Sequence, residues 1–443
     1  MHLSEETLSL SPSDLTAYLA CPHLTTLSLE VAHGSAERPH HREALAQLVV
    51  DKGDLHEQRY LEHLRCEGKQ IVEIELPKQL GAFDEAHTAT VAAMRDGAQV
   101  IYQATFVRGG WRGRSDFLVR VEEPSGLGAW SYEPWDTKLA RTAKPAAVLQ
   151  LAWYAGEIAA VQGRMPERLY VVLGTSEVEA YRPADVDAYL RSAQRRLRSH
   201  VEERPETYPW PCEHCSRCDF VSVCRERWKS DDHLTRVASI RRDHIGKLAS
   251  VDVTTLTDLA EAPPDLSVRR LAPAMVEKLR DQAALQLHRY RSGELRYRLL
   301  HPEERRGLGL LPAPSPGDLF FDMEGDPFFD PACGLEFLFG VLWRKTDASV
   351  TYRSFWAYDR EGERHAFEEF VDFVGDRRRT FPEMHVYHYA AYEPSTLARL
   401  MGTHATREEE IDQFLRGEVL VDLLQVVRQG MRAGVDSYSL KDV

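Results

Sequence analysis

Five cysteines in two separate places constrain this chain more than any other feature of its sequence. Cys215, Cys218 and Cys224 follow the spacing C-x2-C-x5-C, Cys212 precedes them, and Cys21 stands far upstream. Thiolates two residues apart can reach one metal centre without distorting the backbone, and such spacing suits the close iron sites of a cubane cluster. We therefore interpret these thiols as ligands of an iron–sulfur cluster.

A compact zinc site is the alternative, because the four thiols between residues 212 and 224 could close a tetrahedron by themselves. A zinc ribbon would instead place two C-x2-C pairs about fifteen to twenty residues apart. Disulfides rank below both interpretations.

Length and composition indicate a globular protein of more than one domain. The chain has 443 residues, which is more than one ordinary domain contains. Of these residues 43% are hydrophobic and 28% charged, a usual mixture for a globular protein. The most apolar predicted helix, residues 145–161, contains Gln150 and Glu157, and the N-terminus lacks an apolar signal core. We expect a cytoplasmic protein without a membrane partner.

The net charge of −14 argues against binding polyanions over the whole surface. A nucleic-acid partner would need a local basic track. Two groups of arginines are candidates for such a track: Arg191, Arg195, Arg196 and Arg198 on a predicted helix, and Arg108, Arg112 and Arg114 around a predicted turn at Gly109-Gly110.

Hydrophobic periodicity divides the chain into three predicted domains, at residues 1–230, 231–310 and 311–443. The first has the element order α-β-β-β-α-β, the second is a helical, hairpin–helix-like module, and the third is again α/β. The predicted elements of the first domain are a helix over 43–65, strands near 99–107, 114–121 and 130–137, a helix over 145–161 and a strand over 169–173.

Two carboxylates and a lysine stand where strands of the first domain end. Asp116 occurs in "GRSDFLV", and Asp136 and Lys138 occur in "YEPWDTKLAR" twenty residues later. Paired aspartates supply hard oxygen ligands for Mg²⁺ or Mn²⁺, and such a cation can polarise a phosphoryl oxygen and activate water. Lys138 could position that water and steady the developing charge.

Three further side chains flank this set in the sequence. His56 on the preceding helix could add an imidazole ligand that favours manganese. Gln150 and Tyr154 would lie on adjacent turns of the following helix, where they could orient substrate or Lys138. Each signal alone is weak, and the ordered set is what indicates a metal-dependent nuclease.

In these motifs residues 8–228 resemble the RecB-like PD-(D/E)xK nucleases, specifically the iron–sulfur branch that includes the AddB nuclease domain and the CRISPR adaptation exonucleases. The resemblance implies a restriction-endonuclease-like α/β core with a catalytic set of His56, Asp116, Asp136, Lys138, Gln150 and Tyr154. It also implies that Cys21, Cys215, Cys218 and Cys224 hold a 4Fe–4S cluster, with Cys212 as a spare or alternative ligand.

The third domain carries a second set of acids. Asp322 and Glu324 in "DLFFDMEGDPFF" alternate along a predicted strand, so both should face one side. This strand resembles the start of a DEDD exonuclease of the ribonuclease H-like fold, with Glu393 where that family has an aspartate. The family's last acid is missing before Val443. We therefore expect a C-terminally incomplete ribonuclease H-like domain, either because the chain is a fragment of a longer protein or because the domain is incomplete as a catalyst. RecB-like nucleases of this arrangement are often joined to a superfamily 1 helicase, which the resemblance implies as a fused or associated partner.

The sequence thus predicts a Mg²⁺- or Mn²⁺-dependent DNA exonuclease acting on single-stranded ends, in DNA repair or foreign-DNA processing. Two alternatives stay open: a noncatalytic scaffold that binds nucleic acid, and a nuclease whose working site is the one with Asp322, Glu324 and Glu393.

Overall fold

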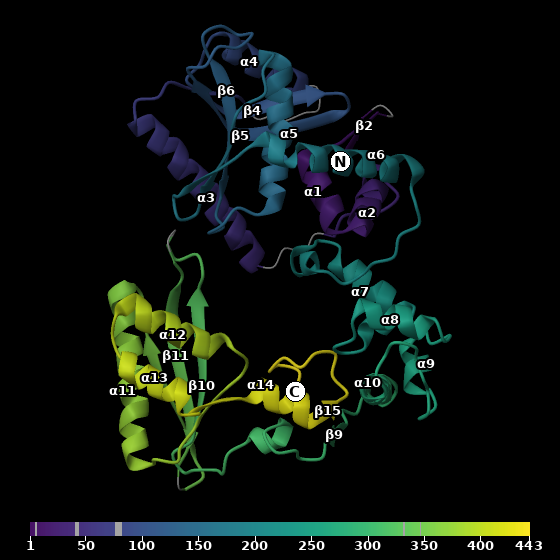
Figure 1. Cartoon of the computed structure of the whole chain (residues 1–443), viewed down its shortest axis with the longest axis vertical. Coiled ribbons are helices and arrows are strands. Elements are labelled where there is room, and N and C mark those ends of the chain that lie inside the picture. Colours follow the sequence, from purple (N-terminus) through teal and green to yellow (C-terminus); the bar gives the residue numbers. More distant parts are fainter. Residues whose placement is uncertain (5–6, 40–43, 76–81, 331–332, 346) are drawn as a thin grey trace. The chain divides into compact units, whose positions relative to one another are not determined.

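The computed structural model forms two compact units, Met1–Arg225 and Glu226–Val443, shown in Figure 1. It describes residues 1–4, 7–39, 44–75, 82–330, 333–345 and 347–443. The boundaries of the three predicted domains stay predictions.

A six-stranded sheet is the centre of the N-terminal unit. Its strands lie in the order β3-β4-β5-β6-β7-β8, with parallel pairs at β3/β4 and β6/β7 and antiparallel pairs elsewhere. The β4–β5 hairpin turns at Gly109 and Gly110, whose φ angles of +58° and +75° suit a tight hairpin turn. The strands are β3 (Ile71–Glu73), β4 (Val100–Arg108), β5 (Trp111–Val121), β6 (Ser131–Lys138), β7 (Leu169–Leu173) and β8 (Val178–Tyr181).

Helices cover both faces of this sheet. Successive side chains on β5 point to opposite faces, and apolar ones on each face are buried against a helix. Phe117 packs with Leu61 and Leu64 of α3 (Ala44–Cys66). Leu118 belongs to the opposite cluster, with residues of α4 (Ala82–Arg95) and α5 (Pro145–Gln162). The predicted α-β-β-β-α-β order is present, and β3, α4 and β8 are additions that the periodicity did not indicate.

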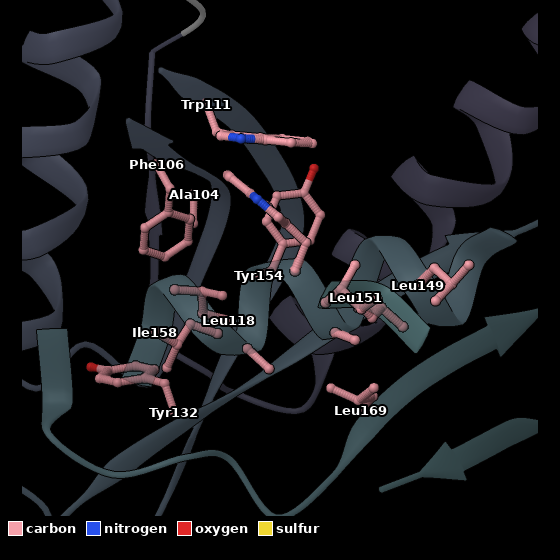
Figure 2. Close-up of a cluster of buried hydrophobic side chains, with 14 of the residues drawn as sticks. Ala104, Phe106, Trp111, Leu118, Tyr132, Leu149, Leu151, Tyr154, Ile158 and Leu169 are labelled. Carbon is pink, nitrogen blue, oxygen red and sulfur yellow. The ribbon is translucent and has the colours of Figure 1, made fainter. Parts of the chain in front are cut away.

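Helix α5 is buried on nearly every side, so it is a core helix of this unit. Figure 2 shows Leu151, Tyr154 and Ile158 of α5 gathered with side chains of the sheet such as Leu118. This packing fixes the helical turn of α5 that carries Tyr154 against β5.

Two short helices near the N-terminus, α1 (Pro12–Ala20) and α2 (Pro22–Ala32), meet at Cys21. Side chains of α2 bind the segment that leads to the other cysteines: His23 Nδ1 lies 2.7 Å from Thr207 Oγ1, and Thr26 Oγ1 lies 3.1 Å from His200 Nε2. The remaining elements of the unit are β1 (His2–Ser4), β2 (Thr7–Ser9), α6 (Pro183–Glu203), the 3-10 helix η1 (Glu213–Arg217) and α7 (Val221–Ser230), which runs into the next unit.

The C-terminal unit begins with short helices that pack around a long one. Its first elements are η2 (Leu234–Arg236), α8 (Arg242–Ala249), α9 (Leu256–Ala260), α10 (Pro273–Ser292) and η3 (Gly307–Leu310). A two-stranded ribbon pairs β9 (Tyr297–Leu299) with β15 (Met431–Ala433), so the end of the chain returns to this helical part.

A five-stranded sheet in the order β12-β11-β10-β13-β14 forms the rest of the C-terminal unit. Strand β10 is antiparallel to β11 and parallel to β13, and α11 covers one face through Phe367, Phe370 and Val374. The elements are β10 (Leu319–Asp326), β11 (Leu335–Arg344), β12 (Val350–Trp356), α11 (Arg360–Thr380), β13 (Val386–His388), α12 (Tyr392–His404), α13 (Glu408–Arg416), β14 (Leu420–Asp422) and α14 (Leu423–Gly430).

In the part of the chain that the structure describes, no helix is both long enough and apolar enough to cross a membrane.

Gly113 on β5 sets how closely α5 approaches the sheet. A Cβ at this position would meet Trp153 at 2.7 Å and Tyr154 at 3.0 Å. We predict that Gly113→Ala lowers the free energy of unfolding by about 1–3 kcal/mol, as overpacking of a core does. Urea denaturation followed by far-UV circular dichroism measures this change.

The matched control is Gly156→Ala on α5, where a Cβ would meet nothing within 4 Å. This variant should be neutral or more stable by up to about 1 kcal/mol, because alanine favours the helix. Equal destabilisation of both variants would contradict the proposed close approach at Gly113.

Candidate active sites and cysteine cluster

Asp116 and Asp136 lie next to each other on β5 and β6. The antiparallel register pairs Phe117 with Trp135, which brings the two aspartates side by side at the end of that ladder. Asp116 Oδ2 accepts hydrogen bonds from Thr137 N at 2.9 Å and Thr137 Oγ1 at 3.1 Å. The strand pairing therefore fixes one carboxylate relative to the other.

Lys138 completes the set, with its Nζ 2.6 Å from Asp136 Oδ2. This contact is an ion pair rather than a directed hydrogen bond, because Asp136 Oδ2 is buried without a well-aligned donor. The Asp136 carboxylate and the Lys138 ammonium lie on the same face of β6 because side chains two residues apart on a strand point to the same side.

The charges of this set are strongly unbalanced. Burial and the neighbouring Asp116 charge raise the pKa of Asp136 well above its ordinary value, and Lys138 opposes that rise. Burial alone would lower the pKa of Lys138, but Asp136, Asp116 and Glu57 together raise it. One lysine thus faces three carboxylates in a partly dry site, which suits an added cation.

Glu57 on α3 is a member of this set that the motifs did not indicate. Burial and the Asp116 charge raise its pKa. Its Oε1 accepts a hydrogen bond from Tyr102 Oη at 2.7 Å and another from Gln103 Nε2. No sequence pattern indicated Glu57, because only the packing of α3 against β4 brings it to this site.

Gln103 has a left-handed backbone with φ +59° in the middle of β4. The register passes from Tyr102↔Phe117 to Ala104↔Ser115, so Gln103 lies beside Asp116. Left-handed conformations are costly for residues other than glycine and cluster at functional sites. The strained residue Gln103 and the carboxylate of Glu57 thus both lie next to Asp116.

The three flanking residues have different surroundings. His56 is buried and its Nε2 lies 3.3 Å from the Val172 carbonyl oxygen, on the strand next to β6. Burial, Asp136 and Asp116 raise the pKa of Tyr154, whose Oη donates to Arg114 O at 2.6 Å. Gln150, by contrast, donates to Ser13 Oγ at 3.4 Å on α1.

The described residues contain no group of three or more His, Cys, Asp or Glu side chains arranged to hold a metal ion. Mg²⁺, however, commonly binds through one or two carboxylates and completes its shell with water and substrate phosphates. The paired Asp116 and Asp136 fit this kind of site, because their mutual repulsion is what a divalent cation would relieve.

The cysteines predicted as cluster ligands form no disulfide, and Cys21, Cys212, Cys215 and Cys218 all lie near enough to Cys224 for their charges to act on it. Burial, together with the charges of the other four thiols, raises the pKa of the Cys224 thiol to about 12. Cys212 Sγ lies 3.7 Å from Cys215 Sγ. Thiolates are ligands for iron–sulfur and zinc centres, but these cysteines are among the described residues in which no metal-binding group is arranged. The 4Fe–4S cluster and the zinc site therefore both stay predictions.

In the C-terminal unit, Asp322 and Glu324 point to the same side of β10, as their alternation predicted. Both are exposed, whereas Phe321 and Met323 between and beside them are buried against α11. The two acids and His388 line a pocket of about 370 Å³ with apolar and aromatic walls.

Glu393, the third acid predicted for this site, is buried at the start of α12. Its Oε2 lies 3.5 Å from His388 Nδ1 and has no directed hydrogen bond. His388 Nδ1 also lies 2.6 Å from Ala390 O, and Ala390 has a left-handed φ of +88°. Glu393 therefore contacts His388, which lines the pocket, but does not line the pocket itself. The left-handed backbone of Ala390 is a strained conformation of the kind that clusters at functional sites.

Comparison with known proteins bears on the C-terminal unit. A family model described as the RNase_H superfamily matches residues 319–443, which begin at the first residue of β10. This match supports a ribonuclease H-like C-terminal domain with a nuclease-like fold. No curated protein matches the chain.

The repulsion between Asp116 and Asp136 should cost stability when divalent cations are removed. We predict that Asp116→Asn, measured by urea denaturation in EDTA, raises the free energy of unfolding by about 0.5–2 kcal/mol. The control is Asp96→Asn, an exposed acid after α4, which should change stability by less than about 0.5 kcal/mol. A destabilised Asp116→Asn variant would refute the repulsion.

The same pair should give a pH dependence with a defined sign. Because folding raises the pKa of Asp136, the stability from its bound proton is fully present below the ordinary pKa of 3.8 and is lost as the pH rises through the folded pKa. In EDTA the advantage of Asp116→Asn over the parent should therefore grow as the pH rises from about 4 to about 7. An advantage that stays constant over this range in the same urea titrations would contradict the assignment.

Proposed function

We propose that this chain is a metal-dependent phosphodiesterase that degrades DNA from single-stranded ends, with its working site at Asp116, Asp136 and Lys138. The observation that carries the proposal is the buried Asp136 carboxylate, held between the Asp116 charge and the Lys138 ammonium 2.6 Å away. The order of the motifs and their resemblance to RecB-like nucleases support DNA as the substrate.

Each side chain has a role that follows from its contacts. Asp116 and Asp136 would supply the oxygen ligands, and Thr137 keeps Asp116 in place. When bound, a divalent cation supplies a polarised phosphoryl oxygen and a water of lowered pKa. Lys138 keeps its proton beside three carboxylates and is available to stabilise negative charge that develops on the phosphate. Tyr154 holds the backbone of Arg114 close to Asp116.

His56 and Gln150 have supporting roles in this proposal. His56 contacts the Val172 carbonyl oxygen, and Val172 pairs with Thr137 on β6, so the imidazole lies beside the strand that carries Asp136 and could add a ligand there. Gln150 ties α5 to α1 through Ser13 and thereby positions the helix that carries Tyr154.

The C-terminal unit is a second candidate nuclease site, and the match of residues 319–443 to the RNase_H superfamily favours it. Asp322 and Glu324 would bind Mg²⁺ or Mn²⁺ on the open face of the sheet, with Glu393 acting through His388. Substitution at Asp322 and at Lys138 in separate proteins distinguishes the two sites.

We also propose that Cys21, Cys215, Cys218 and Cys224 hold a 4Fe–4S cluster that joins the two ends of the N-terminal unit. The mutual electrostatic effect of the thiols and the contacts of α2 with residues 200 and 207 support this role. The RecB-like resemblance is the reason to propose a superfamily 1 helicase as a partner in repair or foreign-DNA processing.

Removing the Lys138 ammonium should abolish most cleavage. We predict that Lys138→Ala degrades end-labelled single-stranded DNA at least about 100-fold more slowly than the parent in Mn²⁺ or Mg²⁺, because a charge-stabilising donor is lost. Lys144→Ala, an exposed lysine at the start of α5, is the matched control and should retain parental activity.

If Lys138→Ala cleaves like the parent while Asp322→Asn does not, the working site is in the C-terminal unit. If neither the parent nor any variant cleaves with either metal, the noncatalytic scaffold replaces the nuclease proposal.

Metal analysis of anaerobically purified protein tests the cysteine proposal. A cubane cluster predicts about four iron and four sulfide per chain, and Cys218→Ser should reduce both. One zinc per chain without sulfide would contradict the cluster and favour the zinc site of Cys212, Cys215, Cys218 and Cys224.

A further inference from the structure

Basic side chains gather in the C-terminal unit at a place that neither predicted arginine track includes. Helix α10, the β9/β15 ribbon and the end of α14 lie together there (Figure 1). We call this group the basic cluster, and its members are Lys278, Arg298, Arg306, Arg428 and Arg432.

Backbone geometry brings these cations together. The antiparallel register places Arg298 directly opposite Arg432, a like-charge cross-strand pair that costs stability. Arg432 Nη1 donates to Arg428 O at 3.1 Å. Arg306 precedes Gly307, which packs so closely against Gly430 that a Cβ on Gly307 would lie 2.8 Å from the Gly430 Cα.

Lys278 joins the cluster from helix α10. It lies one turn before Gln282, whose Nε2 donates to Ala433 O of β15 at 2.8 Å. Burial lowers the pKa of Lys278, and the charges of Arg432, Arg428 and Arg306 lower it further. The positive charges of the cluster therefore repel one another in a partly buried environment.

Few carboxylates compensate this charge. Arg298 pairs with Asp281, and Arg306 pairs with Glu303 at 2.9 Å. Across residues 1–4, 7–39, 44–75, 82–330, 333–345 and 347–443, no ion pair involves Lys278, Arg428 or Arg432. A chain with 14 more acids than bases thus concentrates unpaired cations at one place, which indicates an anionic ligand.

Hydrogen bonds link the strand that carries Arg432 to the wall of the pocket that holds Asp322 and Glu324. Ala433 N of β15 donates to Tyr438 Oη at 3.1 Å, and Tyr438 O accepts from Tyr389 Oη at 2.8 Å. Tyr389 lines that pocket. One residue, Tyr438, therefore connects the cluster to the wall of the candidate site.

We propose that the basic cluster binds the phosphodiester backbone of a single-stranded nucleic acid and leads the strand toward the pocket with Asp322 and Glu324. Arginine and lysine side chains gathered at one place suit a polyanion whose charges lie close together along a chain. The direction of the strand toward the acids rests on the second candidate site of the proposed function, whereas binding by the cluster does not.

Binding is measured on the full chain in EDTA, so that no cleavage occurs, by fluorescence anisotropy of a labelled single-stranded DNA over a series of salt concentrations. The test variants are Lys278→Gln/Arg428→Gln and Arg428→Gln alone, which removes an exposed side chain. The control is Arg364→Gln, an exposed arginine on α11 outside the cluster.

The double variant should bind more weakly than the parent, and the slope of log K against log salt should fall by about 0.7 for each lost phosphate contact. The single variant should show about half of this fall, and Arg364→Gln none. Thermal unfolding of both variants should occur at or above the parental midpoint, because each removes a repelled cation. Parental affinity and slope in the variants would overturn the proposal.

Competition identifies the ligand. Unlabelled DNA should displace the probe, whereas inorganic phosphate or polyglutamate at equal charge should not; equal displacement by either would overturn a nucleic-acid backbone as the ligand. The outcome is separate from catalysis: a parent that binds but cleaves nothing refutes only the proposed function, and a parent that cleaves while the variants bind normally refutes only the basic cluster.

Discussion

The juxtaposition of Asp116 and Asp136 across neighbouring strands is the constraint on which the rest of the N-terminal unit depends. The β5/β6 register places the two carboxylates together, Thr137 holds one, and Lys138 partly neutralises the other. Burial makes the repulsion expensive, since a carboxylate without compensation is costly in a dry environment. Such a pair is stable only if the surrounding fold keeps it in place, and a cation is what would relieve it.

The surrounding fold supplies that support from both faces of the sheet. An aromatic cluster of Tyr60, Phe117 and Trp135 anchors α3, and Tyr60 and Trp135 stack with ring centroids 6.2 Å apart. This anchoring holds Glu57 beside Asp116. On the other face, Gly113 lets α5 approach until Tyr154 reaches the Arg114 carbonyl. The site is thus built from strand register and helix packing rather than from one loop.

Much of this arrangement could be predicted from the sequence because it follows from periodicity and from motifs within single elements. The strands that carry Asp116, Asp136 and Asp322 lie where alternation placed them, and D-x-K and D-x-E each put two side chains on one face. Glu57, Gln103 and the basic cluster could not be predicted. Glu57 belongs to the site only because α3 packs on β4, and Arg298 meets Arg432 only through a ribbon that joins residues more than a hundred positions apart. No pattern within one element reports such pairings.

Anomalous diffraction from crystals soaked in Mn²⁺ would locate the cation that the paired carboxylates are expected to bind. We predict a manganese peak between the carboxylates of Asp116 and Asp136, lost in crystals of the Asp136→Asn variant. Manganese at Asp322 and Glu324, with no peak beside Asp116, would contradict this assignment and move the metal-dependent chemistry to the C-terminal unit.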